Sequence, residues 1–180
     1  MHFEPQRIPG VWLIRPEPHR DARGELRRHF CAAEFLGAGL DPTVRQANIA
    51  ENPSAGTLRG FHYQLPAQGE NKVISCLRGT IYDVVVDLRR SSPTWLTWQA
   101  FDLDDRNQQM LYVPIGCANA YLTRQAHTLI HYYHSEFFVP ESYRGFRWND
   151  PLLGVTWPAA PVLVSEKDSQ YPDLDLETLP

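Results

Sequence analysis

Two β-rich runs on either side of a glycine limit the possible folds of this chain more than any other feature. Residues 72–77 and 80–88 are rich in β-branched and apolar side chains, and Arg78-Gly79 separates them. Two such runs around a glycine turn predict a β-hairpin. Elsewhere helical periodicity is scarce, and 15 prolines and 11 glycines interrupt the chain at short intervals. The sequence therefore predicts an all-β sandwich or barrel.

Further strands are expected wherever a β-rich segment lies between turns. The pattern predicts them over residues 10–15, 25–30, 44–50, 95–103, 110–113, 118–122 and 128–138. Residues 32–36, followed by Gly37, predict one brief helix. Residues 162–168 are expected to be extended, and the acidic tail after Tyr171 is expected to be loose. No internal repeat or linker divides residues 1–180, so the chain is predicted to form a single domain.

Charge and hydropathy exclude several classes of protein. The formal net charge is −4, and the sequence lacks the basic stripe that nucleic-acid-binding proteins carry. No apolar run approaches the ~20 residues of a membrane-spanning helix, and the N-terminus lacks the apolar segment of a signal peptide. The expectation is a cytoplasmic protein with no nucleic-acid or membrane partner. Cys31, Cys76 and Cys117 lack metal-type spacing and are predicted to be buried free thiols.

Two predicted strands each place polar side chains on one face. In the segment LRGFHYQ, strand alternation puts His62 and Gln64 on one side and the aromatic rings on the other. In the predicted strand 128–138, Tyr132 and His134 share a face. A histidine on a strand is more often a structural hydrogen-bonding residue than a catalyst, so this pattern by itself leaves the role of His62 open.

A metal-binding cupin is the first barrel to test against these residues. Its site typically needs His-x-His, an acidic residue, and a further histidine after a Pro-x-Gly turn, because imidazoles and carboxylates satisfy a divalent metal. Here His62 is followed by Tyr63-Gln64, and Asn119 follows the Pro-Ile-Gly turn. The sequence therefore predicts no metal site, although His131 or His134 could contribute a ligand from another strand.

Several short motifs occur in order along the chain. They are LRGFHYQ (58–64), RG with DVVVDLR (78–89), SSPT (91–94), PES with RG (140–145), RWNDP (147–151) and SEKD (165–168). Together they resemble the dTDP-4-dehydrorhamnose 3,5-epimerase family of metal-free cupins, from about Asp21 to Asp168. The resemblance implies a cupin-type jelly-roll β-barrel with short peripheral helices. It also implies a homodimer that acts on a nucleotide-sugar substrate without metal or organic cofactor.

The resemblance implies a reaction and a role for four residues. The family's substrate is a nucleotide-diphosphate-linked 4-keto-6-deoxy sugar, whose ketone acidifies the hydrogens on carbons 3 and 5. Inverting such a carbon needs a base on one face, an acid on the other, and a group that holds the enolate oxygen. By position in the motifs, His62 matches the base and Asp168 the carboxylate that orients it. Lys72 matches the group at the enolate oxygen, and Tyr132 the acid.

Purely structural roles are the alternative for these four residues. His62 could be a core hydrogen-bonding residue, Asp168 a turn cap, and Lys72 a solvated charge at the start of a strand. For Tyr132 the alternative is a register shift of one residue, which would place Tyr133 on the face assigned to the acid.

Other positions match the family's binding residues. Arg59 and Arg23 match positions that hold the diphosphate, a task for which fork-shaped guanidinium groups are suited. Gln46 and Asn48 match positions that line the nucleotide site.

Two residues depart from the family pattern. Asn119 stands where the family usually has an active-site histidine, and asparagine cannot relay a proton. Arg28 stands where the family commonly has a glutamate near the nucleotide base, which leaves room for a CDP- or other nucleotide-linked sugar unless Arg28 points to solvent. The main hypothesis is epimerisation of dTDP-4-dehydro-6-deoxy-glucose at carbon 3, carbon 5 or both, in deoxysugar biosynthesis. The alternatives are a single-centre 3- or 5-epimerase and a non-catalytic cupin that binds a sugar nucleotide.

Overall fold

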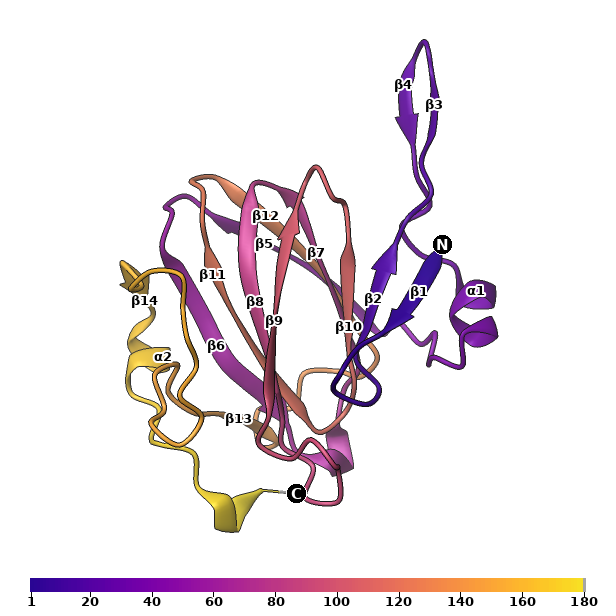
Figure 1. The fold of residues 1–180 in the computed structure, drawn as a ribbon. Helices are drawn as coiled ribbons and strands as arrows, with labels where there is room; N and C mark the ends of the chain where they lie inside the picture. Colours follow the sequence, from indigo (N-terminus) through magenta and orange to yellow (C-terminus); the bar gives the residue numbers. More distant parts are fainter. Residues whose placement is uncertain (180) are drawn as a thin grey trace.

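The computed structural model describes residues 1–179 as a barrel of two facing β-sheets (Figure 1). The first sheet has the order β1 (His2–Pro5), β2 (Trp12–Arg15), β10 (Met110–Val113), β7 (Lys72–Arg78), β12 (Thr128–His134) and β5 (Gln46–Asn52). The second has the order β13 (Tyr143–Gly145), β6 (Thr57–Gln64), β11 (Cys117–Thr123), β8 (Thr80–Asp87) and β9 (Trp98–Asp104), with β14 (Leu163–Val164) beside β6. This arrangement confirms the predicted all-β, cupin-type jelly-roll barrel.

Apolar side chains fill the space between the two sheets and cover both outer faces. Strand β8 shows why its central residues, Val84-Val85-Val86, do not alternate with polar ones. Val85 packs in the cluster between the sheets, whereas Val84 and Val86 pack in the cluster on the outer face. A strand that is buried on both sides has no polar face, so its sequence does not alternate.

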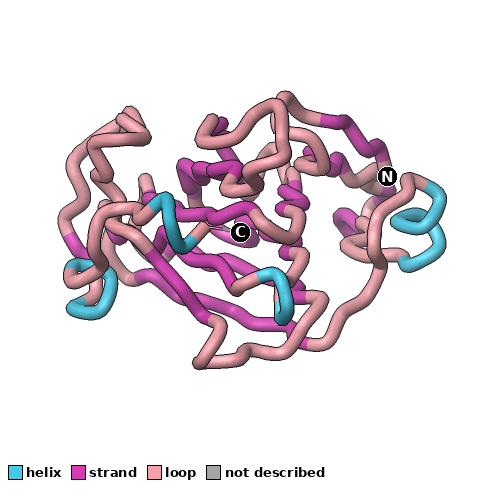
Figure 2. The backbone as a smooth tube through the Cα atoms, turned by 90° about the horizontal axis from the view of Figure 1, so that it is seen from below, coloured by secondary structure: helices cyan, strands magenta, loops and turns pink. Residues whose placement is uncertain are grey.

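Short peripheral elements cover the outer faces of the barrel. Helix α1 (Ala32–Gly37), as predicted, lays Phe35 against the outer face of the first sheet beside Tyr112. The second sheet is covered by the irregular C-terminal chain, whose Trp157 packs against Phe61. Figure 2 shows the molecule turned by 90° and seen from below.

The prediction of a loose C-terminal tail is wrong. Leu174 and Leu176 pack against the outer cluster of the second sheet, and Leu179 is 7% exposed. The backbone amide of Leu174 donates a hydrogen bond of 2.7 Å to the carboxylate of Asp150. The tail therefore belongs to the folded barrel, because its spaced leucines bury apolar surface that the acidic composition concealed.

The predicted hairpin around Gly79 is also wrong, although both of its strands exist. Strand β7 lies in the first sheet between β10 and β12, whereas β8 lies in the second sheet between β9 and β11. Only Gly79 separates the two strands, and a tight hairpin needs a loop of two residues. Gly79 instead exchanges hydrogen bonds with Asp105 and has a φ of +86°. The glycine thus carries the chain from one sheet to the other.

Several element boundaries differ from the expected ones. The expected strand 25–30 ends at Leu26, in the hairpin of β3 (His19–Asp21) and β4 (Gly24–Leu26), and the expected strand 128–138 ends at His134. The expected extended piece 162–168 contains only β14 and then turns into helix α2 (Glu166–Ser169). Two 3₁₀ turns, Pro66–Gln68 and Leu176–Thr178, complete the described elements.

The three cysteines are free, as predicted, but only two of them are buried. Cys76 and Cys117 lie in the barrel interior, where burial raises the pKa of each thiol to about 12. Cys31 is only partly buried, because it precedes α1 instead of lying in a strand. Within residues 1–179, no helix is long and apolar enough to cross a bilayer.

Candidate active site

A cavity of about 540 Å³ lies between the two sheets and contains most of the residues singled out in the sequence. The predicted residues among its lining are His62, Lys72, Tyr132, Asp168, Arg59, Gln46, Asn48 and Asn119. Strand register explains how they converge. Across the first sheet, Gln46 pairs with His134, which pairs with Lys72, so these three side chains form a row on one face. Across the second sheet, Asn119 pairs with His62.

His62 and Asp168 form a hydrogen-bonded pair at one wall of the cavity. His62 Nε2 lies 2.8 Å from Asp168 Oδ1, and the amide of Gly60 donates to Asp168 Oδ2 at 3.2 Å. The helix cap is Ser165, whose hydroxyl accepts from the Asp168 amide, so the Asp168 carboxylate is not used as a cap. A Cβ at Gly60 would lie 2.6 Å from Asn119 O, so only glycine fits between β6 and β11.

The surroundings of this pair favour a neutral imidazole beside an ionised carboxylate. Burial lowers the pKa of His62, and the hydrogen bond that His62 donates to Asp168 opposes this shift without cancelling it. Burial has the largest single effect and would raise the pKa of Asp168, but the hydrogen bond from His62, the charge of His62, the hydrogen bond from the Gly60 amide and the charge of Lys167 together lower it. With Nε2–H directed at Asp168, the lone pair on Nδ1 remains available, so His62 can accept a proton.

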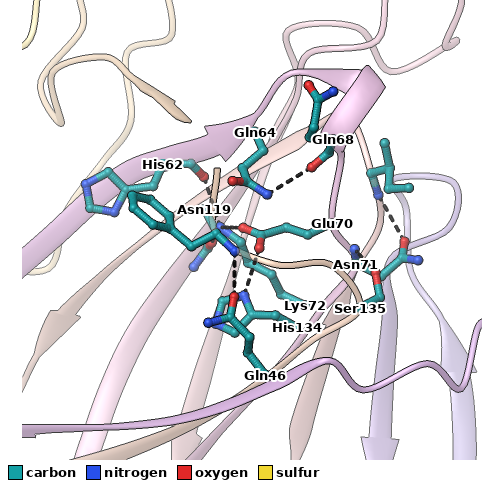
Figure 3. A network of polar contacts seen from close by, with 12 residues as sticks. Gln46, His62, Gln64, Gln68, Glu70, Asn71, Lys72, Asn119, His134 and Ser135 are labelled. Carbon is teal, nitrogen blue, oxygen red and sulfur yellow. Dashed lines mark hydrogen bonds and ion pairs between the residues drawn. The ribbon is translucent and has the colours of Figure 1, made fainter. Parts of the chain in front are cut away.

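Lys72 is a buried cation next to this pair. The residue is 6% exposed, which excludes the alternative of a solvated charge. Its Nζ donates to Asn119 Oδ1 at 3.2 Å and to the His62 carbonyl at 3.3 Å, and it lies 3.3 Å from Glu70 Oε1 (Figure 3). An ammonium group held in a cavity of low dielectric stabilises a negative oxygen far more than it would in water.

Tyr132 lies on the first sheet, across the cavity from the sheet that carries His62. It pairs with Asn48 of β5 and lines the cavity. Tyr133 is on the opposite face, with its ring 5.4 Å from that of Phe30, so the shift by one residue does not occur. Burial, and then the neighbouring Tyr121, raise the pKa of Tyr132 well above its usual value. The hydroxyl therefore stays protonated.

The lining residues predicted to bind the nucleotide lie towards the exposed side of the cavity. Arg59 and Asn48 are both exposed, and Arg59 Nε donates to Asn52 Oδ1 at 3.0 Å. Gln46 is partly buried, and its side-chain oxygen accepts from the amide of Phe138 at 2.6 Å. Arg59 is thus a cation at the rim of the cavity, where it is available to bind an anionic group.

Arg23 and Arg28 do not line this cavity in the single chain. Arg23 lies between β3 and β4 in the hairpin that projects from the barrel (Figure 1), with its side chain 90% exposed and bonded to Asp21. Arg28 lines a separate cavity beside the N-terminus and pairs with Glu34 at 2.6 Å. Their predicted roles stay predictions.

Sequence reasoning missed three polar residues near the site. Glu70 lies in a loop without periodicity, and His134 was placed on the face of Tyr132 but considered only as a possible metal ligand. Asp83 is fully buried on β8, and its two carboxylate oxygens have no hydrogen-bond partner among residues 1–179. Burial raises the pKa of Asp83 well above its usual value. Asp83 could have been recognised from its place in a valine-rich strand, since a charged residue in such a strand must lie in the barrel interior.

His131 does not reach the cavity, because its side chain lies on the other face of β12 from Tyr132, with its ring 4.4 Å from that of Tyr133. Among residues 1–179, no group of three or more His, Cys, Asp or Glu side chains is arranged to hold a metal ion.

A jelly-roll barrel that holds an oriented imidazole, a buried ammonium group and a protonated phenol in one cavity has the features of a proton-transferring isomerase of the cupin class. Comparison with known proteins agrees with this class. The family model described as dTDP-4-dehydrorhamnose 3,5-epimerase matches residues 5–175. The chain belongs to the dTDP-4-dehydrorhamnose 3,5-epimerase family.

Individual relatives cover nearly the whole chain. The dTDP-4-dehydrorhamnose 3,5-epimerase of Sinorhizobium fredii is 37% identical over 97% of this chain and 90% of its own length. The crystal structure of the enzyme of that name from Bacillus anthracis, with TDP and PPi bound, has a TM-score of 0.93 at 31% identity, covering 96% of this chain and 99% of its own. A 3′-monoepimerase from Streptomyces bikiniensis in complex with dTDP-quinovose has a TM-score of 0.88 at 34% identity, covering 97% of this chain and 88% of its own.

Proposed function

We propose that this protein is an epimerase that inverts the carbons beside the ketone of a dTDP-linked 4-keto-6-deoxyhexose, in deoxysugar biosynthesis. One observation carries the proposal. The Asp168-bound His62 of the second sheet and the protonated Tyr132 of the first sheet line the same cavity, next to the buried Lys72. Inversion requires groups on both faces of the sugar ring, and residues from the two sheets can supply them.

The proposed reaction begins with proton removal by His62. The imidazole takes the proton from carbon 3 or carbon 5, and the electron pair of the C–H bond forms the enolate. Lys72 stabilises the negative charge on the oxygen at carbon 4. Asp168 stabilises the imidazolium that has formed. Tyr132 then delivers its proton to the opposite face of the same carbon, and the carbonyl group re-forms. Water removes the proton from His62 and restores the one on Tyr132.

Nucleotide binding in this proposal uses both the cavity rim and a second copy of the chain. Arg59 binds the diphosphate at the rim, next to Gln46 and Asn48 on the nucleotide side. Arg23, on its projecting hairpin, reaches the diphosphate in the cavity of a partner, and Arg28 lies near the base. The 90% exposure of the Arg23 side chain supports this assignment, because nothing in its own barrel covers it.

Four broader assignments belong to the same proposal. Residues 1–180 act as one domain, the protein is a homodimer, and it works in the cytoplasm without a cofactor. The free thiols Cys76 and Cys117 are compatible with a reducing compartment.

A single-centre epimerase is the second candidate, and Asn119 favours it. This residue occupies the cavity position at which the family usually has histidine, and its side chain accepts from Lys72 without carrying a transferable proton. A monoepimerase is also among the similar structures.

Proton NMR of dTDP-4-keto-6-deoxyglucose in deuterated water tests the proposal. Deuterium is expected to enter at carbon 3, carbon 5 or both, and the His62→Ala variant is expected to abolish this entry while retaining its circular dichroism spectrum. Absence of exchange with the wild-type protein, together with binding of dTDP measured by calorimetry, would contradict catalysis and favour a binding protein. Absence of both would point to another nucleotide, for which Arg28 is the first residue to test.

A further inference from the structure

The cavity contains a second carboxylate–imidazole pair that the proposed reaction does not use. Glu70 Oε2 lies 3.0 Å from His134 Nδ1 (Figure 3). This distance is close to the 2.8 Å between Asp168 Oδ1 and His62 Nε2. The side chains of Glu70 and His134 are 8% and 16% exposed, and both line the cavity. Both side chains are therefore buried in the cavity wall, in contrast to a surface ion pair, whose side chains are mobile.

The position of His134 on its strand places it beside the predicted proton donor. Tyr132 and His134 are two residues apart on β12, so their side chains share a face, and their rings stack with centroids 5.7 Å apart. His62 comes from the opposite sheet. Two groups that can carry a transferable proton thus lie side by side on the wall facing the base.

The charges around His134 support a role in proton transfer. Burial has the largest single effect and would raise the pKa of Glu70, but the hydrogen bonds and charges of His134 and Lys72 together hold this pKa below its usual value. Glu70 is therefore an ionised carboxylate held against the His134 imidazole. Nδ1 of His134 is directed at Glu70, so Nε2 is the ring nitrogen that remains available to a ligand in the cavity. Nε2 has no hydrogen-bond partner among residues 1–179.

We propose that the Glu70–His134 pair is a second acid–base pair of this site, which returns the proton to one of the two carbons beside the ketone while Tyr132 serves the other. This inference rests on the proposed function. It also assigns to His134 the proton transfer that Asn119 cannot perform. The wild-type protein is therefore predicted to invert both carbons.

The proton balance of the proposed step is simple. His62 removes a proton from the carbon, and the electron pair of that C–H bond enters the enolate. The proton on Nε2 of the His134 imidazolium then bonds to the opposite face of the same carbon through the electron pair of the enolate double bond, and the carbonyl re-forms. His134 regains a proton from water, and His62 releases one to water.

The test measures inversion at each carbon separately, by proton NMR of the sugar products in deuterated water. His134→Gln is expected to slow inversion at one carbon by at least about 100-fold, so that the singly inverted sugar accumulates. Deuterium should still enter the uninverted carbon with retained configuration, because His62 remains. Tyr132→Phe is expected to affect the other carbon, and Glu70→Gln to lower inversion at the same carbon as His134→Gln by a smaller factor.

His131→Gln is the matched control, because it is the same substitution on the same strand with the side chain on the face away from the cavity. It should leave inversion at both carbons unchanged. Equal slowing at both carbons in His134→Gln, with a lowered melting temperature, would show a structural role and overturn the inference. Unchanged inversion in His134→Gln, or a wild-type protein that inverts only one carbon, would also overturn it. A wild-type protein with no exchange at all would instead contradict the proposed function itself.

Discussion

Replacing Asp168 by asparagine tests how the carboxylate supports His62. The side chain is 5% exposed, and its oxygen lies 2.8 Å from His62 Nε2. Asparagine has nearly the same shape but no charge, so it loses the charge-assisted part of the hydrogen bond to the imidazolium that forms during the reaction. A hydrogen bond to a charged group contributes about 1.5 to 3 kcal/mol, and the burial of Asp168 favours the upper part of this range. A loss of about 2 to 3 kcal/mol lowers kcat/KM by about 30- to 150-fold.

The pH profile of Asp168→Asn has a defined direction. Asp168 raises the pKa of His62 against the larger effect of burial, so its removal lowers that pKa further. Because the neutral imidazole is the base, the acidic limb of kcat/KM should move to lower pH. The assay is the rate of deuterium entry into the sugar between about pH 5 and pH 8, a range chosen around the ordinary pKa of histidine.

Asp87→Asn is the matched control, since Asp87 is fully buried and bonded to Arg89 but does not line the cavity. It should reduce the melting temperature and leave kcat/KM of the folded protein unchanged. A rate of Asp168→Asn within threefold of the wild type, or an acidic limb that moves to higher pH, would refute the reasoning.

Three further predictions concern charge, assembly and pH. Lys72→Met should lower kcat by at least about 100-fold with a smaller change in KM, whereas Lys72→Arg should retain the charge and part of the rate. Equal rates for the two variants would contradict the role of Lys72 at the enolate oxygen. Arg23→Ala should weaken dTDP binding about tenfold, measured by calorimetry, without changing the dimer mass measured by light scattering. Arg20→Ala on the same hairpin should leave dTDP binding unchanged. A monomeric wild-type protein would contradict the role of the partner. Burial, and then the neighbouring His131, lower the pKa of His29 from 6.5 to about 4. The unfolded chain thus takes up a proton that the folded chain does not, so stability to urea should fall between about pH 6.5 and pH 4, and His29→Gln should flatten this fall.

Local alternation predicted the faces of the site strands but not their partners. His62, Tyr132 and His134 lie on the expected faces, because side-chain direction in a strand depends only on its own residues. The pairing of β7 and β8 was predicted wrongly, because the partner of a strand is set by contacts between distant segments. Periodicity could not have joined Asp168 to His62 across 106 positions; only the order of motifs suggested it.

Loop residues and assembly were the least predictable parts of the site. Glu70 lies outside any strand, and its approach to His134 depends on how the chain enters β7 after the 3₁₀ turn Pro66–Gln68. The resemblance supplied Arg23 as a diphosphate ligand, yet one copy of the chain places this residue on a projecting hairpin. A sequence describes one chain, so the proposed contribution of a second chain has no local signature.

A crystal structure with a dTDP-linked 6-deoxyhexose in the cavity tests the central claim most directly. The account predicts that the sugar lies between the two sheets, with carbon 3 or carbon 5 within about 3.5 Å of His62 Nδ1 and the Tyr132 hydroxyl on the opposite face of the ring. It also predicts Lys72 Nζ within hydrogen-bonding distance of the oxygen on carbon 4. A sugar bound outside the cavity, or one with His62 and Tyr132 on the same face, would contradict proton transfer between the two walls.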